Sequence, residues 1–252
     1  DEMLAGWAAE GIGTGRVQRL KGKLPGLYMI ETDPDGERRF FHWRDSAAAR
    51  LLMDLPQTDE LLASLAGDKV VYLSAITLSL YGDKGRARLF AALRAVREKG
   101  TRVAFDTNFR ARGWPDLDLA RRVYQEMFAI ADIVLASTED LLPLYSGGDS
   151  ADLLARIPSS ETVLKLAEPA CIVSAVGHVE RVEAEPLARP VVDTTAAGDS
   201  FAAAYLAARQ NGASPVAAAQ AGHRLAGIVV GHPGAIVPRA AMPADMLKRA
   251  GT

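Results

Sequence analysis

The sequence predicts an α/β fold in which helices cover both faces of a mostly parallel sheet. From about residue 58 onward, short apolar runs that suit buried strands alternate with longer helix-like segments. Strands separated by helices of about 10–15 residues are typical of parallel sheets that are buried on both faces. The right-handed crossovers of such sheets place the carboxyl ends of the strands along one edge, where we expect the ligand site.

The predicted elements follow in order along the chain. Residues 1–10 form a helix, because Met3, Leu4 and Trp7 share one helical face. The strand-like segments are residues 70–73, 102–105, 133–135, 162–166, 171–174 and 178–183. The helical segments are residues 58–66, 84–99, 117–130, 198–211 and 215–230.

Residues 27–30 and 40–43 predict an antiparallel hairpin that is separate from this alternating body. The two runs are rich in aromatic and aliphatic residues and are joined across Asp33-Pro34-Asp35-Gly36, a strong turn signal. We therefore divide the chain into an α/β domain of residues 1–14 and 49–252 and a β lid of residues 15–48.

Composition limits the classes of function. The 252 residues carry a net charge of −2, and the 29 basic and 31 acidic residues are spread without blocks of one sign. A protein that binds duplex nucleic acid normally has a basic face, so we expect no such partner. No apolar run approaches the roughly 18 residues that a membrane helix needs. Cys171 is the only cysteine, which excludes an internal disulfide and suits a reducing cytosol, so we expect a cytoplasmic protein.

Residues 192–201 (VDTTAAGDSF) carry the clearest chemical signal. Small residues at 196–198 let the backbone turn tightly, and the first N–H groups of the helix that follows form an anion site. Asp199 in that first turn is stabilised as a carboxylate by the helix dipole. Beside a bound phosphoryl group it can take a proton from an attacking hydroxyl. The alternative is that Asp199 is only an acidic residue at a helix start.

This segment closely resembles the DTxGAGDxF signature of the PfkB sugar kinases, which have a ribokinase-like three-layer α/β/α fold with a small β-sheet lid. The resemblance implies an ATP-dependent sugar kinase that uses Mg²⁺, with Asp199 as the general base. It also implies that the backbone N–H groups of Ala197, Gly198 and Asp199 form an anion hole. Ala196 stands where the family more commonly has glycine.

Other segments resemble the same family along nearly the whole chain. Residues 105–114 resemble its DxNxR segment, which lines the cleft. Residues 131–140 resemble its NxxE region, which supports magnesium and phosphate, although Ser137 and Asp140 replace the Asn and the Glu. The resemblance implies a metal contact at Asp140. It also implies a nucleotide site that includes Ser137, Lys165, Ala196, Ala197, Gly198, His223 and Gly234.

The hairpin segment carries the signal for the sugar. Residues 25–28 and 40–48, with HPGAI at residues 232–236, resemble the lid and C-terminal region of 2-keto-3-deoxygluconate kinases. The resemblance implies that the substrate is a sugar acid contacted by Tyr28, His42, Arg44, Arg110 and Asp199. A guanidinium can bind the carboxylate of such an acid bidentately, whereas a neutral hexose has no carboxylate. The alternatives are that Arg44 is a solvated hairpin arginine and that Tyr28 only packs on its strand.

Two further readings stay open. One is a kinase for a neutral sugar such as fructose or ribose, and the other is a catalytically silent binding protein on the same scaffold. The sequence has no GxxxxGK[ST] motif, which excludes a P-loop kinase at the level of motifs.

The PfkB family begins with a strand, a glycine pair and an asparagine, and we expect these residues to precede Asp1. The exposed edge of the hairpin predicts a homo-oligomer formed through the lid.

Overall fold

The computed structural model describes residues 1–32, 38–243 and 245. Within them, the main sheet has the strand order β3-β4-β5-β6-β7-β8. Strands β3 to β6 are mutually parallel, while β7 and β8 are antiparallel to their neighbours. The predicted mostly parallel α/β fold is therefore confirmed. The strand bounds are β3 (Val70–Ser74), β4 (Arg102–Asp106), β5 (Ile133–Ser137), β6 (Glu161–Lys165), β7 (Ala170–Ala175) and β8 (His178–Glu183).

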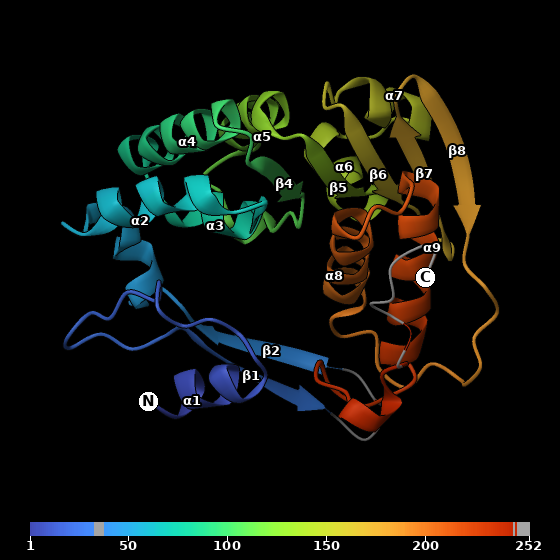
Figure 1. Cartoon of the computed structure of the whole chain (residues 1–252), viewed down its shortest axis with the longest axis horizontal. Helices are drawn as coiled ribbons and strands as arrows, with labels where there is room; N and C mark the ends of the chain where they lie inside the picture. The colour runs from blue at the N-terminus through green and yellow to red at the C-terminus, as the bar shows by residue number, and fades with distance from the viewer. Residues whose placement is uncertain (33–37, 244, 246–252) are drawn as a thin grey trace.

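Helices cover the sheet on both faces and make three layers, which can be followed in Figure 1. Alternate strand residues face opposite layers. Val103 and Phe105 of β4 pack with α4 (Asp83–Glu98) and α5 (Leu117–Ile130), whereas Ala104 faces the layer of α8 (Ala197–Gln210) and α9 (Pro215–Val229). The first layer also contains α2 (Thr58–Ser64), α3 (Ala75–Leu80), α6 (Thr138–Tyr145) and α7 (Ser150–Ala155).

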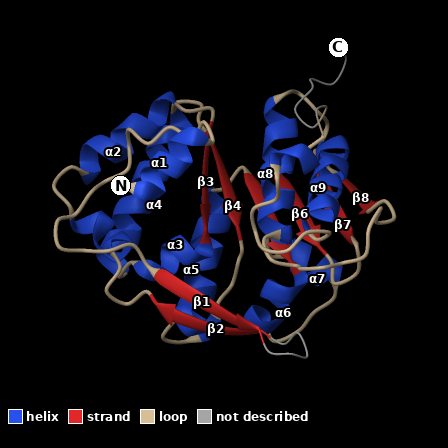
Figure 2. Cartoon of the chain, turned by 90° about the horizontal axis from the view of Figure 1, so that it is seen from below, coloured by secondary structure: helices blue, strands red, loops and turns tan. Residues whose placement is uncertain are grey.

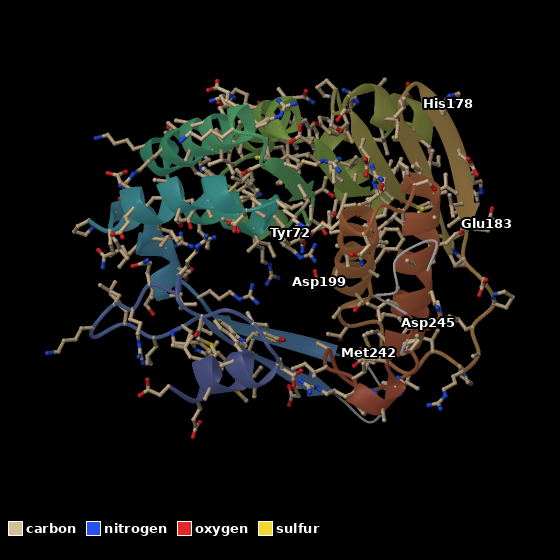
Figure 3. The ribbon with its side chains drawn as sticks, viewed as in Figure 1. Tyr72, His178, Glu183, Asp199, Met242 and Asp245 are labelled. Atoms are coloured by element: carbon tan, nitrogen blue, oxygen red, sulfur yellow. The ribbon has the colours of Figure 1, made fainter. Side chains whose placement is uncertain are left out.

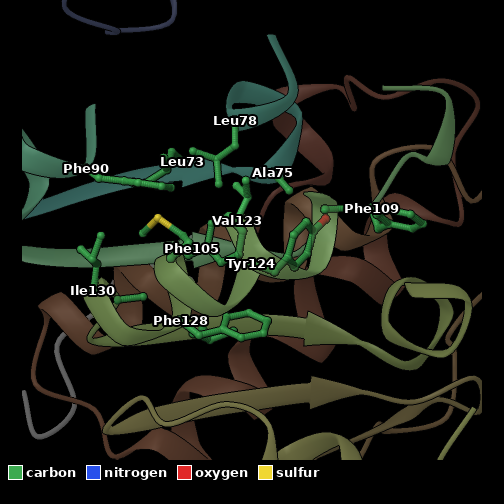
Figure 4. Packing of buried hydrophobic residues seen from close by; sticks show 14 of the residues in the cluster. Leu73, Ala75, Leu78, Phe90, Phe105, Phe109, Val123, Tyr124, Phe128 and Ile130 are labelled. Atoms are coloured by element: carbon green, nitrogen blue, oxygen red, sulfur yellow. The ribbon is translucent and has the colours of Figure 1, made fainter. Parts of the chain in front are cut away.

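An aromatic cluster fixes α5 against the sheet. The ring of Tyr124 meets Phe105, Phe109, Trp114 and Phe128 edge to face, with ring centroids 5.7–6.1 Å apart. Figure 4 shows Tyr124 together with Phe105, Phe109 and Phe128 of this cluster. Such pairs contribute about 0.5–1.5 kcal/mol each beyond the burial of their area. The cluster therefore holds the loop that follows β4, which carries Phe109, in one place.

A buried ion pair ties α8 to β6. The Glu161 carboxylate accepts hydrogen bonds from Arg209 at 2.7 and 2.8 Å, from the Tyr205 hydroxyl at 2.7 Å and from Arg102 at 3.3 Å. Burial by itself raises the pKa of Glu161, but the hydrogen bonds from Arg209 and Tyr205 hold that pKa below its ordinary value. The second half of α8 is thus fastened to the amino end of β6.

Close contact between α8 and α9 depends on a glycine. A Cβ atom on Gly222 would lie 2.8 Å from the ring of Phe201, closer than real carbon contacts allow.

The Cys171 thiol on β7 is buried in the same hydrophobic cluster as Phe201, and burial raises its pKa to about 12. Its burial and raised pKa make it a packed, unreactive thiol.

The predicted hairpin is a separate two-stranded sheet of β1 (Leu27–Thr32) and β2 (Arg38–Trp43). Figure 2 shows it apart from the strands of the main sheet. Its antiparallel register pairs Tyr28 with His42, while the predicted turn at Asp33-Pro34-Asp35-Gly36 lies outside the described residues. The predicted N-terminal helix is α1 (Glu2–Ala9), and the chain enters the main domain through a 3₁₀ helix (Ala48–Asp54). Within the described residues, no helix is both long and apolar enough to cross a membrane.

Candidate active site

The carboxyl ends of four parallel strands meet at one edge of the sheet. The register places Ser74 beside Asp106 and Ser137 beside Lys165, so each strand contributes a polar residue at its last position. The first turn of α8 reaches the same edge, because a Cβ atom on Gly198 would lie 3.6 Å from the Lys165 ammonium nitrogen. The sheet edge thus brings together Lys165 and Gly198, two of the residues predicted for the nucleotide site.

The chain turns sharply into α8 at Ala196. This residue has φ 61° and ψ 13°, a left-handed conformation that costs an L-residue about 1–2 kcal/mol. The helix then begins at Ala197, so the N–H groups of Gly198 and Asp199 have no acceptor one turn back within the helix. The Asp199 side chain is exposed to solvent.

One predicted member of the anion hole differs from the expectation. The Ala197 N–H donates to the Thr194 carbonyl at 3.3 Å, because the left-handed Ala196 folds residues 194–197 into a turn. Among the residues that the structure describes, the free donors of this turn are therefore those of Gly198 and Asp199, while Ala196 and Ala197 shape the backbone.

The Asp193 side chain stabilises the turn before α8 by two hydrogen bonds to backbone N–H groups. Its carboxylate accepts the Thr195 N–H at 2.8 Å and the Gly234 N–H at 2.9 Å. The predicted residue Gly234 thus contributes its backbone to the loop structure, and its φ of 77° suits glycine. One carboxylate joins the entrance of α8 to the loop that follows α9.

Two residues at the sheet edge, Asp106 and Tyr72, were not among the predicted site residues, although Asp106 lies in the segment 105–114 that resembles the cleft lining of the family. The Asp106 carboxylate is only 3% exposed and lies 3.8 Å from the Lys165 ammonium. It accepts the Tyr72 hydroxyl at 3.3 Å and the Asn108 N–H at 3.2 Å. Tyr72 lies near Asp199 at this end of the sheet (Figure 3), and burial together with the Asp106 and Asp199 charges raises the pKa of Tyr72. A polar residue that ends an apolar strand was the available signal for Asp106.

Asp140 and Ser137 lie at the start of α6. The Ser137 hydroxyl accepts the Asp140 N–H at 3.1 Å and so caps the helix. The Asp140 carboxylate is buried and accepts the Thr107 hydroxyl at 2.7 Å and the Phe109 N–H at 2.9 Å. The guanidinium of Arg110 lies 3.5 Å away from it. Asp140 therefore holds the loop after β4, from which Arg110 extends with most of its side chain exposed.

The hairpin brings Tyr28 and Arg44 together. The guanidinium carbon of Arg44 lies 5.4 Å from the centre of the Tyr28 ring, within the range of a cation–π contact. Both side chains are exposed, Tyr28 to 45%. His42 lies on β2 opposite Tyr28, but its side chain is outside the part of the structure that can be described.

A cavity of about 760 Å³ lies between α9 and the segment that follows β8. It is lined by residues 183 and 185–189, by α9 residues that include His223, and by His232. The His223 ring stands edge-on to Phe201 at 5.0 Å, and within the described residues its buried Nε2 atom has no hydrogen-bond partner. Burial lowers the pKa of His223, which favours the neutral imidazole.

Known proteins resemble this chain over most of its length. A 2-dehydro-3-deoxygluconokinase from Dickeya dadantii is 43% identical over 249 residues, which cover 96% of this chain and 80% of that protein. A fructokinase from Klebsiella pneumoniae is 32% identical over 184 residues, which cover 71% of this chain and 57% of that protein. Among solved structures, a fructokinase with bound ATP from Xylella fastidiosa shares the fold at a TM-score of 0.78 and 21% identity, covering 96% of this chain and 78% of that one.

The family comparison gives the same result. The model of the pfkB family of carbohydrate kinases matches residues 1–242. These residues include the main sheet, the hairpin and the turn into α8. The chain belongs to the pfkB family of carbohydrate kinases.

Proposed function

We propose that this protein transfers the γ-phosphoryl group of ATP to a hydroxyl of 2-keto-3-deoxygluconate and forms 2-keto-3-deoxy-6-phosphogluconate. The observation that carries the proposal is the exposed Asp199 carboxylate beside the free amides of α8 and the Lys165 ammonium. The sugar acid is supported by the 2-dehydro-3-deoxygluconokinases, which match more of this chain at higher identity than the fructokinases do.

Asp199 acts as the general base in this proposal. It takes the proton of the sugar hydroxyl while that oxygen bonds to the γ-phosphorus and the bond from phosphorus to ADP breaks. The Gly198 and Asp199 N–H groups stabilise the negative charge on the transferred phosphoryl oxygens, and the dipole of α8 adds to this. Lys165 contributes a cation at the same turn.

The residues present fit ATP. A cavity of about 760 Å³ is within the range of about 300–1,000 Å³ that small-molecule sites occupy. His223 would contact the base there, since its unpartnered Nε2 atom can accept or donate a hydrogen bond. The amino end of α8 would hold the phosphates, with Ala196, Ala197 and Gly234 shaping the loops around them.

Mg²⁺ fits as an ion held mainly by phosphate. Proteins usually bind it through one or two carboxylates together with substrate phosphates and waters. Within the described residues, no group of three or more metal-ligating His, Cys, Asp or Glu side chains is present, which agrees with such a site. Asp140 as a metal contact stays a prediction, and its carboxylate already accepts two hydrogen bonds from the loop after β4.

A substrate assay tests the proposed function directly. Purified protein is given ATP and Mg²⁺ with 2-keto-3-deoxygluconate, fructose or ribose, and ADP release is followed. We expect kcat/KM to be highest for the keto acid. Faster phosphorylation of fructose or ribose would favour a kinase for a neutral sugar. The absence of turnover with all three sugars would favour a binding protein without catalytic activity.

Replacing Arg44 by glutamine is expected to raise KM for the keto acid by roughly ten- to more than a hundredfold. The proposed bond from the guanidinium to the substrate carboxylate is worth about 1.5–3 kcal/mol, and Arg110→Gln should act in the same direction. Steady-state kinetics with the keto acid and with a neutral hexose measure the effect. The matched control is Arg50→Gln, an exposed arginine just beyond the hairpin. An equal loss for both sugars would remove Arg44 from carboxylate recognition.

We also propose that two copies associate through the hairpin. Leu27, Met29, Phe41 and Trp43 share one face of the two-stranded sheet, and each of these side chains is 44–57% exposed. An isolated hairpin is marginally stable in water, so an apolar face of this kind favours a covering partner.

The expected result is a dimer that the double substitution Phe41→Ser and Trp43→Ser converts to a monomer. The substitutions remove two stacked rings, whose centroids are 6.5 Å apart, from the shared face. Sedimentation velocity measures the change, and Val179→Ser on the exposed β8 edge is the control. A wild-type chain that sediments as a monomer at high concentration would contradict this prediction.

A further inference from the structure

A buried carboxylate sits directly behind the Lys165 ammonium. Asp106 ends β4 and Lys165 ends β6, and their side chains are 4% and 18% exposed. The Lys165 nitrogen lies 3.8 Å from Asp106 Oδ2, which is the distance of an ion pair rather than a hydrogen bond. In the described part of the chain the Lys165 ammonium makes no hydrogen bond, so its three N–H donors are available for a ligand.

The Asp106 carboxylate is itself held on two further sides. Its Oδ2 atom accepts the Tyr72 hydroxyl from β3, and its Oδ1 atom accepts the backbone N–H of Asn108 from the loop after β4. These bonds fix the carboxylate relative to the sheet. The ammonium that pairs with it is thereby kept near the sheet edge, although a lysine side chain has several freely rotating bonds.

The ammonium is directed toward the turn that begins α8. A Cβ atom on Gly198 would lie 3.6 Å from the Lys165 nitrogen, which is ordinary van der Waals contact, so the ammonium stands next to the first turn of α8. The nearest first-turn N–H donors are those of Gly198 and Asp199. A phosphoryl group at this turn would meet two amides and one ammonium.

The charges around Asp106 explain why the Asp106 carboxylate and the Lys165 ammonium depend on each other. Burial raises the pKa of Asp106, the Lys165 charge opposes this rise, and the Asp140 and Asp199 carboxylates add to it. Without the Lys165 cation, the buried Asp106 carboxylate would face the negative charges of Asp140 and Asp199 with no compensating ammonium. Removing the carboxylate leaves a lysine with no fixed direction.

We propose that Lys165 contacts the transferred phosphoryl group and that Asp106, held by Tyr72, is the positioning residue that aims its ammonium. This inference rests on the proposed function, because the phosphoryl group is the ligand of that reaction. It goes beyond the proposed kinase activity because it assigns roles to Asp106 and Tyr72. It also couples Tyr72, Asp106 and Lys165 through one hydrogen bond and one ion pair.

The first test is the kinetics of single variants on whichever sugar the wild-type protein phosphorylates best. Lys165→Met is expected to lower kcat by about 10²–10³-fold, the typical effect of losing one preorganised charge donor. The KM for the sugar should stay within about threefold, since the charge acts on the transition state. Asp106→Asn should lower kcat by about tenfold or more, and Lys99→Met, an exposed lysine at the end of α4, should not change it.

The decisive measurement is the double variant. If Asp106 acts only by aiming Lys165, Asp106→Asn in the Lys165→Met background causes no further loss of kcat beyond about threefold. Losses that multiply would overturn the positioning role. A raised KM with unchanged kcat in Lys165→Met would overturn the phosphoryl contact. Thermal melting accompanies each variant, and Tyr72→Phe gives a milder version of the same test if Asp106→Asn does not fold.

Failure of the inference is distinct from failure of the proposed function. Wild-type turnover of any sugar with near-normal kcat in Lys165→Met sinks the inference alone. A wild-type protein that phosphorylates no sugar removes both.

Discussion

Asp199→Asn is expected to lower kcat by about 10²–10⁴-fold, the usual contribution of a general base. Asparagine keeps the size of the side chain and its place in the first turn of α8, but it cannot accept the proton of the sugar hydroxyl. Because Asp199 is exposed, the substitution leaves the core untouched. ATP affinity and the melting temperature should therefore stay near their wild-type values.

The control for this prediction is Asp118→Asn. Asp118 is also an aspartate in the first turn of a long helix, α5, and it is exposed. Its loss should leave kcat unchanged. If Asp199→Asn turned over at a rate close to the wild type, Asp199 would have no part in the chemistry.

Glu161→Gln is expected to destabilise the folded protein by about 3–5 kcal/mol at pH 7, as breaking a buried ion pair usually does. The substitution leaves Arg209 without its carboxylate at the end of α8. Urea or guanidinium unfolding measures the effect. The matched control is Glu126→Gln, which breaks the exposed pair with Arg94 and should cost at most about 1 kcal/mol.

The loss of stability caused by Glu161→Gln should become smaller as the pH falls. The pKa of Glu161 in the folded protein is lower than its ordinary value, so the pair stabilises the fold fully above the ordinary pKa of glutamate. That contribution is lost as the pH falls through the lowered pKa. The gap in stability between wild type and Glu161→Gln should therefore shrink in acid. A gap that stayed constant from pH 7 down into that range would contradict the assignment.

Much of the fold could be predicted because the strands are short apolar runs between helices. The predicted strand of residues 102–105 is β4 (Arg102–Asp106), and the predicted helix of residues 117–130 is α5. The short helices α1 and α2 were predicted, but α3, α6 and α7 were missed. The apolar residues of α3 follow β3 without a turn, so periodicity alone cannot separate them from the strand, and α6 contains Pro143.

The site could be predicted in part, because its chemistry is local only at the turn into α8. The ten residues from 192 to 201 carry that turn in one stretch of sequence. Asp106, Tyr72 and Lys165 come from three separate strands, and only their pairing in the sheet brings them together. The position of Asp106 at the end of an apolar strand is visible in the sequence, but its burial to 3% exposure and its partners are not. The bond between Ala197 and Thr194 depends on the left-handed backbone at Ala196, which no sequence rule assigns to alanine.

The two bonds of Asp193 give the molecule a thermodynamic linkage. One oxygen holds Thr195 in the turn before α8, and the other holds Gly234 in the loop after α9. A ligand that restricts either loop thus lowers the entropy cost of ordering the other. Occupation of one loop and occupation of the other should then show positive cooperativity, with the Asp193 carboxylate as one of the links between them.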